Sequence, residues 1–330
     1  EKKMDKKKRT LAMFLIGCIL ALGMTGCGRK DERFTIRSEV DQLHNGDAKF
    51  YKDYVITNVG GIFTIYDLDG KKLQEYPDIS VNWLDGITED DIIIYGNFDK
   101  QIGILQLNDK LQVVSNNIII ETENLQIDPT IIKVDGKYYI TVTEIQGTVN
   151  NADPNAENGI YTLKLYKSED LTKWEFVSDV VKFQNNIEDV DVRYDNEKLY
   201  VFFEKETVDR GDSSINVAVS SDASGKEFNE IHELLPATCD HEPAIVEKIK
   251  DGYRLYYSCD KNYHGESYNG GQVFYAEYDS QWNAKKTDEK VDTETEKGIL
   301  LYDVTQNGTK KMLVYTRNYL TDNDMVIEEQ

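Results

Sequence analysis

A four-stranded unit is repeated along this chain, and the repeat restricts the possible folds more than any other feature. The segment Asp128–Ile140 has a counterpart at Asp189–Val201, with aspartate, lysine and tyrosine at matching positions 61 residues apart. A third copy begins at Glu242 and returns through Leu255–Tyr257. After each hairpin come a third strand and a fourth strand, which begins near an aromatic residue. Such repeats are typical of folds whose units bury their faces against one another.

The spacing of short apolar runs indicates strands rather than helices. Runs rich in tyrosine, valine and isoleucine are separated by turn dipeptides, a pattern typical of antiparallel hairpins. These dipeptides are Asp69-Gly70, Asp135-Gly136, Asp251-Gly252 and Asn307-Gly308. The 21 tyrosines and only five prolines of the chain suit long runs of paired strands. The fold class is therefore predicted to be all-β.

The number of repeats sets the expected architecture. Two weaker units precede the three clear ones, at residues 49–76 and 81–115, and a partial unit follows at 299–327. Four-stranded units of this kind predict a β-propeller with four antiparallel strands per blade. We expect five blades, with the last partial unit pairing with N-terminal strands to close the ring, and six blades as the alternative. A β-sandwich is disfavoured because sandwiches do not repeat a four-stranded unit so regularly.

The first residue of the innermost strand is acidic in the three clear units. These residues are Asp128, Asp189 and Glu242. In a propeller the innermost strands surround the axis, so their opening residues are expected to converge on one face. The competing explanation is structural, because an acidic residue before proline often starts a turn.

The N-terminus has the features of a secretion leader. Residues 6–9 are basic, residues 11–24 are almost entirely apolar, and a Gly-Cys pair ends at Cys27. An apolar stretch this short is typical of a cleaved signal rather than a membrane-spanning helix. The ending resembles a lipobox, which implies acylation of Cys27 and a lipid anchor in the membrane. The alternative is an ordinary signal peptide with an incidental cysteine.

Three segments follow from this interpretation. We expect a lipoprotein signal peptide at 1–26, a lipidated tether at 27–47 and the propeller at 48–330, on the extracytoplasmic face of the cell membrane. The formal net charge of the whole chain is −22, and the expected leader is basic, so the mature chain is more acidic still. Such a charge argues against binding nucleic acid or anionic headgroups.

Two cysteines remain in the propeller, Cys239 and Cys259. They flank a predicted hairpin, and they form either a disulfide or two isolated buried thiols. No spacing of cysteine and histidine resembles a zinc site. No cofactor is expected, since the loops lack the dense oxygen-ligand pattern of a calcium site.

The order of these motifs is similar to that of a known enzyme family. The Asp-Pro opening at 128–129, the turn Lys167-Ser168-Glu169-Asp170-Leu171-Thr172-Lys173-Trp174 and the Glu-Pro opening at 242–243 resemble five-bladed propellers of glycoside hydrolase family 43. The related invertase-type families share this scaffold. The likeness covers about residues 126–283, around half the chain.

The resemblance implies roles for particular carboxyl groups. Glu242 would be the general acid, and Asp189 would raise its pKa, with Asp191 as the alternate for Asp189. The base would be Asp128, which has the better motif, or Asp85. Two further side chains are expected to bind substrate, His241 beside Glu242 and Trp83 near a strand opening.

Two classes of function follow. The first is a surface glycosidase that hydrolyses oligosaccharides or polysaccharides by carboxylate acid/base catalysis. The second is a propeller lipoprotein that binds glycan or a partner protein without hydrolysis.

Overall fold

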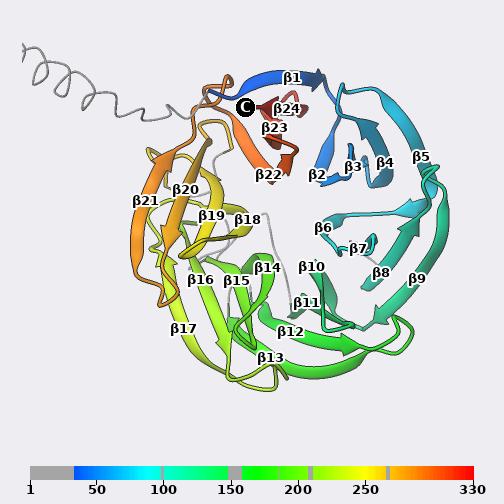
Figure 1. Ribbon diagram of the computed structural model, residues 1–330, viewed down its shortest axis with the longest axis vertical. Coiled ribbons are helices and arrows are strands. Elements are labelled where there is room, and N and C mark those ends of the chain that lie inside the picture. The colour runs from blue at the N-terminus through cyan, green and yellow to red at the C-terminus, as the bar shows by residue number, and fades with distance from the viewer. Residues whose placement is uncertain (1–32, 98–99, 148–157, 185, 207–210, 265–267) are drawn as a thin grey trace, which may run out of the picture. The chain divides into compact units, whose positions relative to one another are not determined.

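The computed structural model describes residues 33–97, 100–147, 158–184, 186–206, 211–264 and 268–330. Residues 34–330 form one compact unit, in which six four-stranded antiparallel sheets are arranged around a central axis (Figure 1). The all-β propeller predicted from the repeat is therefore confirmed. No helix in the described ranges is long and apolar enough to span a membrane.

Each of the first five blades is formed by four consecutive strands, numbered outward from the axis. They are β2 (Asn45–Tyr51), β3 (Tyr54–Val59), β4 (Ile62–Asp67) and β5 (Lys72–Ser80); β6 (Trp83–Ile87), β7 (Ile92–Asn97), β8 (Gln101–Leu107) and β9 (Val113–Glu121); β10 (Leu125–Val134), β11 (Lys137–Gln146), β12 (Ile160–Ser168) and β13 (Glu175–Gln184); β14 (Ile187–Asp195), β15 (Lys198–Glu206), β16 (Ser213–Ser220) and β17 (Phe228–Leu235); and β18 (Glu242–Ile249), β19 (Gly252–Cys259), β20 (Gln272–Tyr278) and β21 (Ala284–Lys290).

The expectation of five blades is wrong, because the partial unit at 299–327 is the core of a sixth. Its three strands are β22 (Ile299–Asn307), β23 (Lys310–Arg317) and β24 (Asp324–Glu329). The outermost strand is β1 (Thr35–Val40), which pairs antiparallel with β24. The unit looked incomplete in the sequence because its fourth strand comes from the other end of the described chain. The N-terminal pairing expected for it does occur.

The propeller also begins earlier than residue 48. The strand β1 and the first residues of β2 lie within the segment expected to be a tether. The predicted leader, 1–26, and the predicted lipidation site, Cys27, lie outside the described residues.

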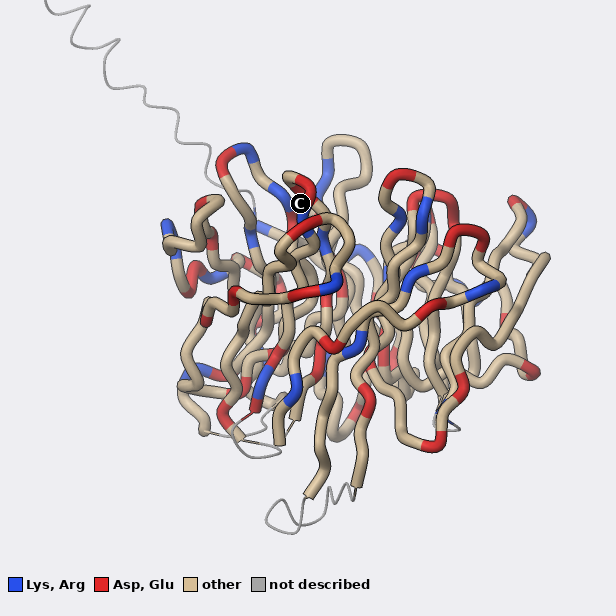
Figure 2. The backbone as a smooth tube through the Cα atoms, turned by 90° about the horizontal axis from the view of Figure 1, so that it is seen from below, with Lys and Arg blue, Asp and Glu red and all other residues tan. Residues whose placement is uncertain are grey.

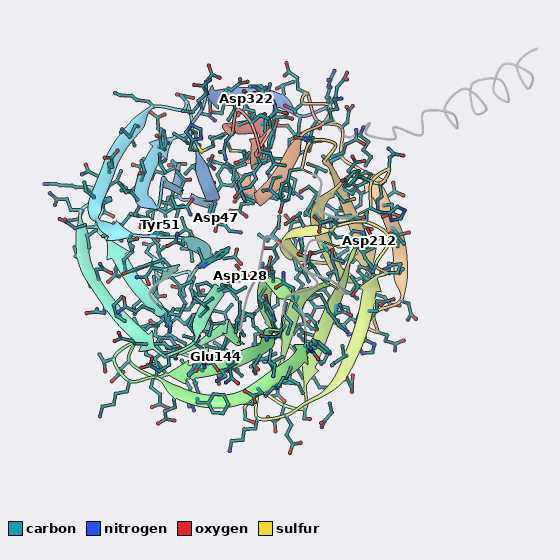
Figure 3. The ribbon with its side chains drawn as sticks, turned by 180° about the vertical axis from the view of Figure 1, so that it is seen from behind. Asp47, Tyr51, Asp128, Glu144, Asp212 and Asp322 are labelled. Atoms are coloured by element: carbon teal, nitrogen blue, oxygen red, sulfur yellow. The ribbon has the colours of Figure 1, made fainter. Side chains whose placement is uncertain are left out.

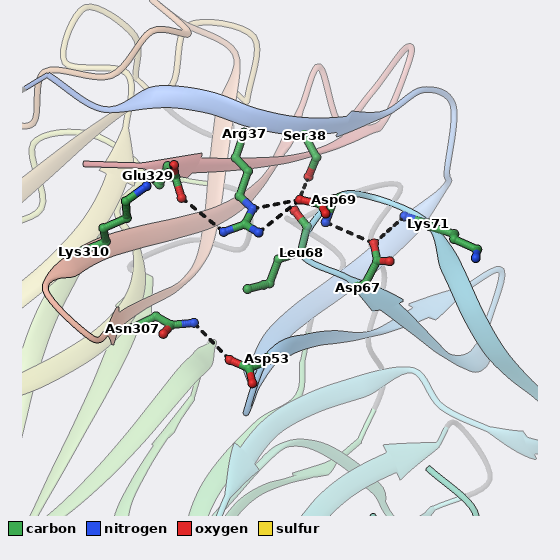
Figure 4. A network of polar contacts seen from close by, with 10 residues as sticks. All are labelled: Arg37, Ser38, Asp53, Asp67, Leu68, Asp69, Lys71, Asn307, Lys310 and Glu329. Atoms are coloured by element: carbon green, nitrogen blue, oxygen red, sulfur yellow. Dashed lines mark hydrogen bonds and ion pairs between the residues drawn. The ribbon is translucent and has the colours of Figure 1, made fainter. Parts of the chain in front are cut away.

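Side chains of β1 join the last blade to the first (Figure 4). The guanidinium of Arg37 contacts Asp69 Oδ1 at 3.1 Å, in the turn before β5, and Glu329 Oε2 at 3.2 Å, on β24. Ser38 Oγ donates a hydrogen bond of 2.9 Å to the carbonyl of Leu68. The seam is therefore closed by backbone pairing within the sixth blade and by polar contacts to the first.

The apolar side chains lie in layers between neighbouring blades. All residues of β16 are buried, whereas all residues of the outermost strand β21 are exposed. Each sheet is thus covered on both faces by its neighbours, which explains the continuous apolar runs of the middle strands. Charged residues of both signs are spread over the surface and the loops (Figure 2).

Candidate active site

A cavity of about 510 Å³ lies on the axis, where the innermost strands begin. Asp47 and Asp128 lie beside the central opening, on the first and third blades (Figure 3). Among the described residues, nine carboxyl side chains and a single cation, Lys49, line the cavity. The carboxyl residues are Asp47, Asp85, Asp128, Glu188, Asp189, Glu204, Glu206, Asp240 and Glu242. The site is thus far more acidic than the repeat alone indicated.

A β-bulge near the start of every innermost strand shapes the cavity wall. In each bulge the innermost strand has one residue more than its partner strand. The bulges lie at 45–48, 83–86, 127–130, 188–191, 243–245 and 301–303. A bulge ends regular pairing and redirects side chains, and bulges are common next to active sites.

Asp128 and Asp189 occupy the same position in the bulges of adjacent blades. Both have φ of 48°, the left-handed conformation that aspartate tolerates better than most residues. The backbone N–H of Asp189 donates a hydrogen bond of 3.1 Å to Asp128 Oδ2. The repeat therefore predicted a shared backbone conformation as well as a shared residue type.

Glu242 reaches the same group from a slightly different position. It pairs with Ser258 and precedes the bulge of β18, whereas Asp128 and Asp189 lie within theirs. Its carboxyl group is hydrogen-bonded to that of Asp189, and carboxylate oxygens of Asp189, Glu204 and Glu242 all lie within 4.8 Å of one another.

Burial and mutual repulsion favour the protonated forms of these groups. Burial raises the pKa of Glu242 well above its usual value, and the charges of Asp240 and Asp189 raise it further. The pKa of Asp128 is raised in the same way, by burial and then by Asp189. A carboxyl hydrogen-bonded to a carboxylate holds one proton between two groups, so this pair can store a proton at neutral pH.

Lys49 on β2 is the cationic counterpart of this acidic group, and the sequence did not reveal it. Its Nζ lies 2.5 Å from Asp85 Oδ1 and donates a hydrogen bond of 2.7 Å to the carbonyl of Tyr302. The pKa of Lys49 is raised despite burial, because Asp85, Asp303 and Asp47 surround it. The first unit lacks the clear Asp-Pro opening, so its Asp47-Ala48-Lys49 segment gave no repeat signal.

Five acidic residues in the wall were also missed: Asp47, Glu188, Glu204, Glu206 and Asp240. Glu204 and Glu206 project from β15, and Asp240 precedes β18. Asn186 Nδ2 donates a hydrogen bond of 2.7 Å to Glu206. Alternation along β15 was the available signal, since residues two apart share a face of a strand.

Of the two predicted substrate contacts, the cavity includes Trp83 but excludes His241. The ring of His241 is 1% exposed, and its Nδ1 lies 2.7 Å from the carbonyl of Ser213. His241 therefore lies outside this cavity, because alternation turns its side chain away from the axis while Asp240 and Glu242 face it.

Asp191, the alternate for Asp189, does not line the axial cavity. It lines a second cavity, of about 330 Å³, which also lies among the innermost strands. There its Oδ1 lies 2.6 Å from Arg193 Nη1, and its Oδ2 accepts a hydrogen bond of 2.9 Å from the backbone of Val246. Asp85, the alternate for the base, lines both cavities.

Cys239 and Cys259 are both buried, and they are not joined by a disulfide.

Comparison with known proteins identifies the scaffold alone. No protein family model matches the sequence, and no curated protein matches it. Among solved structures, the chain is similar to the glycoside hydrolase family 93 α-L-arabinofuranosidase of Fusarium graminearum, with a TM-score of 0.53 and 12% identity over 87% of this chain and 98% of that one. It is also similar to an exo-β-1,3-galactanase from Phanerochaete chrysosporium, with a TM-score of 0.51 and 11% identity over 78% of this chain and 61% of that one. A family 43 protein of Bacteroides ovatus matches with a TM-score of 0.46 and 13% identity, and this chain spans 48% of its length. The fold of this chain is thus that of glycoside hydrolase propellers.

Proposed function

We propose that this protein hydrolyses glycosidic bonds in the axial cavity, with Glu242 as the proton donor. The observation that carries the proposal is the carboxyl pair of Glu242 and Asp189. Glycoside hydrolysis needs one carboxyl group that is protonated and another that is ionised. The pair supplies the protonated group, because Asp189 holds the carboxyl of Glu242 in place and raises its pKa.

Asp85 is the better candidate for the base. Burial raises its pKa, but the direct ion pair with Lys49 favours its charged form. Asp128 forms no ion pair with any described lysine or arginine, and its neighbour Asp189 disfavours its ionisation. The strands β6 and β18 also belong to opposite blades of the six, so a sugar held between Asp85 and Glu242 would lie across the axis.

The cavity suits a carbohydrate without negative charge. Its acidic wall would repel carboxylated or sulfated sugars. Aromatic side chains offer apolar faces for sugar rings, and five of them line the cavity with the acids: Trp83, Tyr161, Tyr268, Tyr302 and Tyr319. We therefore propose neutral oligosaccharides or polysaccharides as substrates.

The deciding experiment compares two kinds of substrate in wild type and Glu242→Gln. Aryl glycosides whose leaving groups need no protonation are set against unactivated oligosaccharides. A general acid contributes about 10²–10⁴-fold, so Glu242→Gln should lose this factor on the oligosaccharides and much less on the activated substrates.

The matched control is Glu247→Gln, on the same strand but paired with Lys311 outside the cavity. It should leave both rates unchanged. Equal losses on both substrate classes for Glu242→Gln would remove this residue from the acid role. A wild type that binds the sugars but cleaves none of them would support the non-catalytic glycan-binding alternative.

We also propose that the enzyme works at the cell surface as a lipoprotein. The basic residues 6–9, the apolar segment 11–24 and Cys27 support this location.

A further inference from the structure

Three metal-ligating side chains meet between the fourth and fifth blades, behind the cavity wall. Cys239 and His241 lie in the segment before β18, and Cys259 ends β19. Their exposed fractions are 1%, 1% and 3%, and their donor atoms all lie within 4.8 Å of one another. Neither sulfur nor imidazole from this group lines the axial cavity.

The imidazole of His241 is held in an orientation suited to a ligand. Its Nδ1 lies 2.7 Å from the carbonyl oxygen of Ser213, which can only accept a hydrogen bond. The proton of the neutral ring is therefore on Nδ1, and the lone pair is on Nε2. That lone pair faces Cys239 Sγ at 3.5 Å. A backbone carbonyl that fixes the second nitrogen is the usual support of a metal-bound histidine.

The distances fit a shared tetrahedral ion. With Zn–S of about 2.3 Å and Zn–N of about 2.0–2.1 Å, two ligands at a tetrahedral angle lie about 3.5 Å apart. The observed separation of Cys239 Sγ and His241 Nε2 is the same. Two thiolates and a neutral imidazole also cancel the charge of a divalent ion, which a buried site requires.

We propose that Cys239, His241 and Cys259 bind one Zn²⁺ ion. A single short loop and a strand end supply the ligands, so the ion would fix the loop that carries Asp240 and Glu242 on its opposite side. Three protein ligands leave one position of the tetrahedron for water or another small donor. The proposal does not depend on the proposed glycosidase activity.

The sequence did not predict this site, because the Cys-x-His pair at 239–241 and the distant Cys259 match no zinc motif. The alternative is a disulfide between Cys239 and Cys259, which lie close together in space. A disulfide would not account for the imidazole of His241, whose lone pair faces Cys239 Sγ.

The test uses the full chain in detergent with Cys18→Ser and Cys27→Ser. Cys239 and Cys259 are then the only cysteines that can bind the metal. After reduction and removal of metal by a chelator, the protein is titrated with Co²⁺ and then with Zn²⁺. We expect one equivalent of Co²⁺ with sulfur-to-cobalt charge-transfer absorption, displaced by one equivalent of Zn²⁺. Added Zn²⁺ should also raise the thermal midpoint of the same protein, because only the folded state presents the complete site.

His241→Gln and Cys259→Ser should abolish the absorption and the thermal shift. The control is His264→Gln, an exposed histidine paired with Asp212, which should change neither. Loss of the variants through misfolding would leave the thermal shift of the parent protein as the deciding measurement. No absorption and no thermal shift in the parent would overturn the proposal. So would the absence of both thiols in unreduced protein that has been unfolded with a chelator present, which would show a disulfide instead.

Discussion

Lys49 and Asp85 form a largely buried ion pair, with 2.5 Å between Nζ and Oδ1 and side chains 11% and 21% exposed, in the wall of both central cavities. Lys49 belongs to the first blade and Asp85 to the second. The pair therefore links two neighbouring blades and places the only described cation of the larger cavity against one of its nine acids. Removing a single partner would leave the other charge buried without compensation.

Lys49→Met is expected to destabilise the propeller by at most about 3–5 kcal/mol, the usual cost of breaking a fully buried pair from one side, because Asp85 retains some contact with solvent. The double variant Lys49→Met/Asp85→Asn should recover part of this loss, because the unpaired carboxylate is gone. Denaturant unfolding of the two single variants and the double variant measures this coupling. Strictly additive effects would show that the two side chains do not interact.

Asp85→Asn and Asp128→Asn separate the two candidates for the base. Loss of the base should lower turnover by about 10²–10⁴-fold, and a small added nucleophile such as azide should restore part of it. We expect this behaviour for Asp85→Asn and a smaller, unrescued change for Asp128→Asn. Rescue of Asp128→Asn alone would assign the base to Asp128 instead.

The propeller is expected to be more stable near pH 5 than at pH 7. Burial raises the pKa of Asp47 from 3.8 to about 6, so the folded state favours its protonated form. The resulting stability is complete below pH 4 and is lost as the pH rises through 6. This pKa difference corresponds to at most about 3 kcal/mol over the whole range, and about half of that, or a few degrees in thermal midpoint, lies between pH 5 and pH 7.

Asp47→Asn should flatten this part of the profile. At acidic pH a second group matters. The ion pair with Lys133 and hydrogen bonds hold the pKa of Asp90 at about 2, so the stability that ionised Asp90 contributes to the fold is lost only as the pH falls below 4. A thermal midpoint that increases steadily from pH 5 to pH 7 in wild type would contradict the prediction.

Cys27→Ala is expected to release the protein from the membrane. The acyl chains would supply the membrane affinity, and the acidic propeller supplies none by charge. Cell fractionation followed by detection of the protein measures the change. Normal cleavage with unchanged membrane association would exclude the lipid anchor.

The sequence by itself determined the class of fold and three acidic residues near the start of innermost strands. Asp128 and Asp189 were found from the repeat because both adopt the same bulge, so the chain carries the same residue at the same position. Glu242 was found from the Glu-Pro opening of the third unit, although it precedes its bulge instead of lying within it. These features depend on neighbours close in the chain, which a sequence pattern records.

Only the tertiary structure decided the blade count and the surroundings of those acids. The sixth blade combines β1 and β24, and Lys49 meets Asp85 from another blade; neither pairing leaves a local pattern. His241 shows the same limit, since one step along an extended chain reverses the direction of a side chain. It therefore lies with Cys239 and Cys259 behind the cavity instead of inside it, because its neighbours Asp240 and Glu242 occupy the inner face.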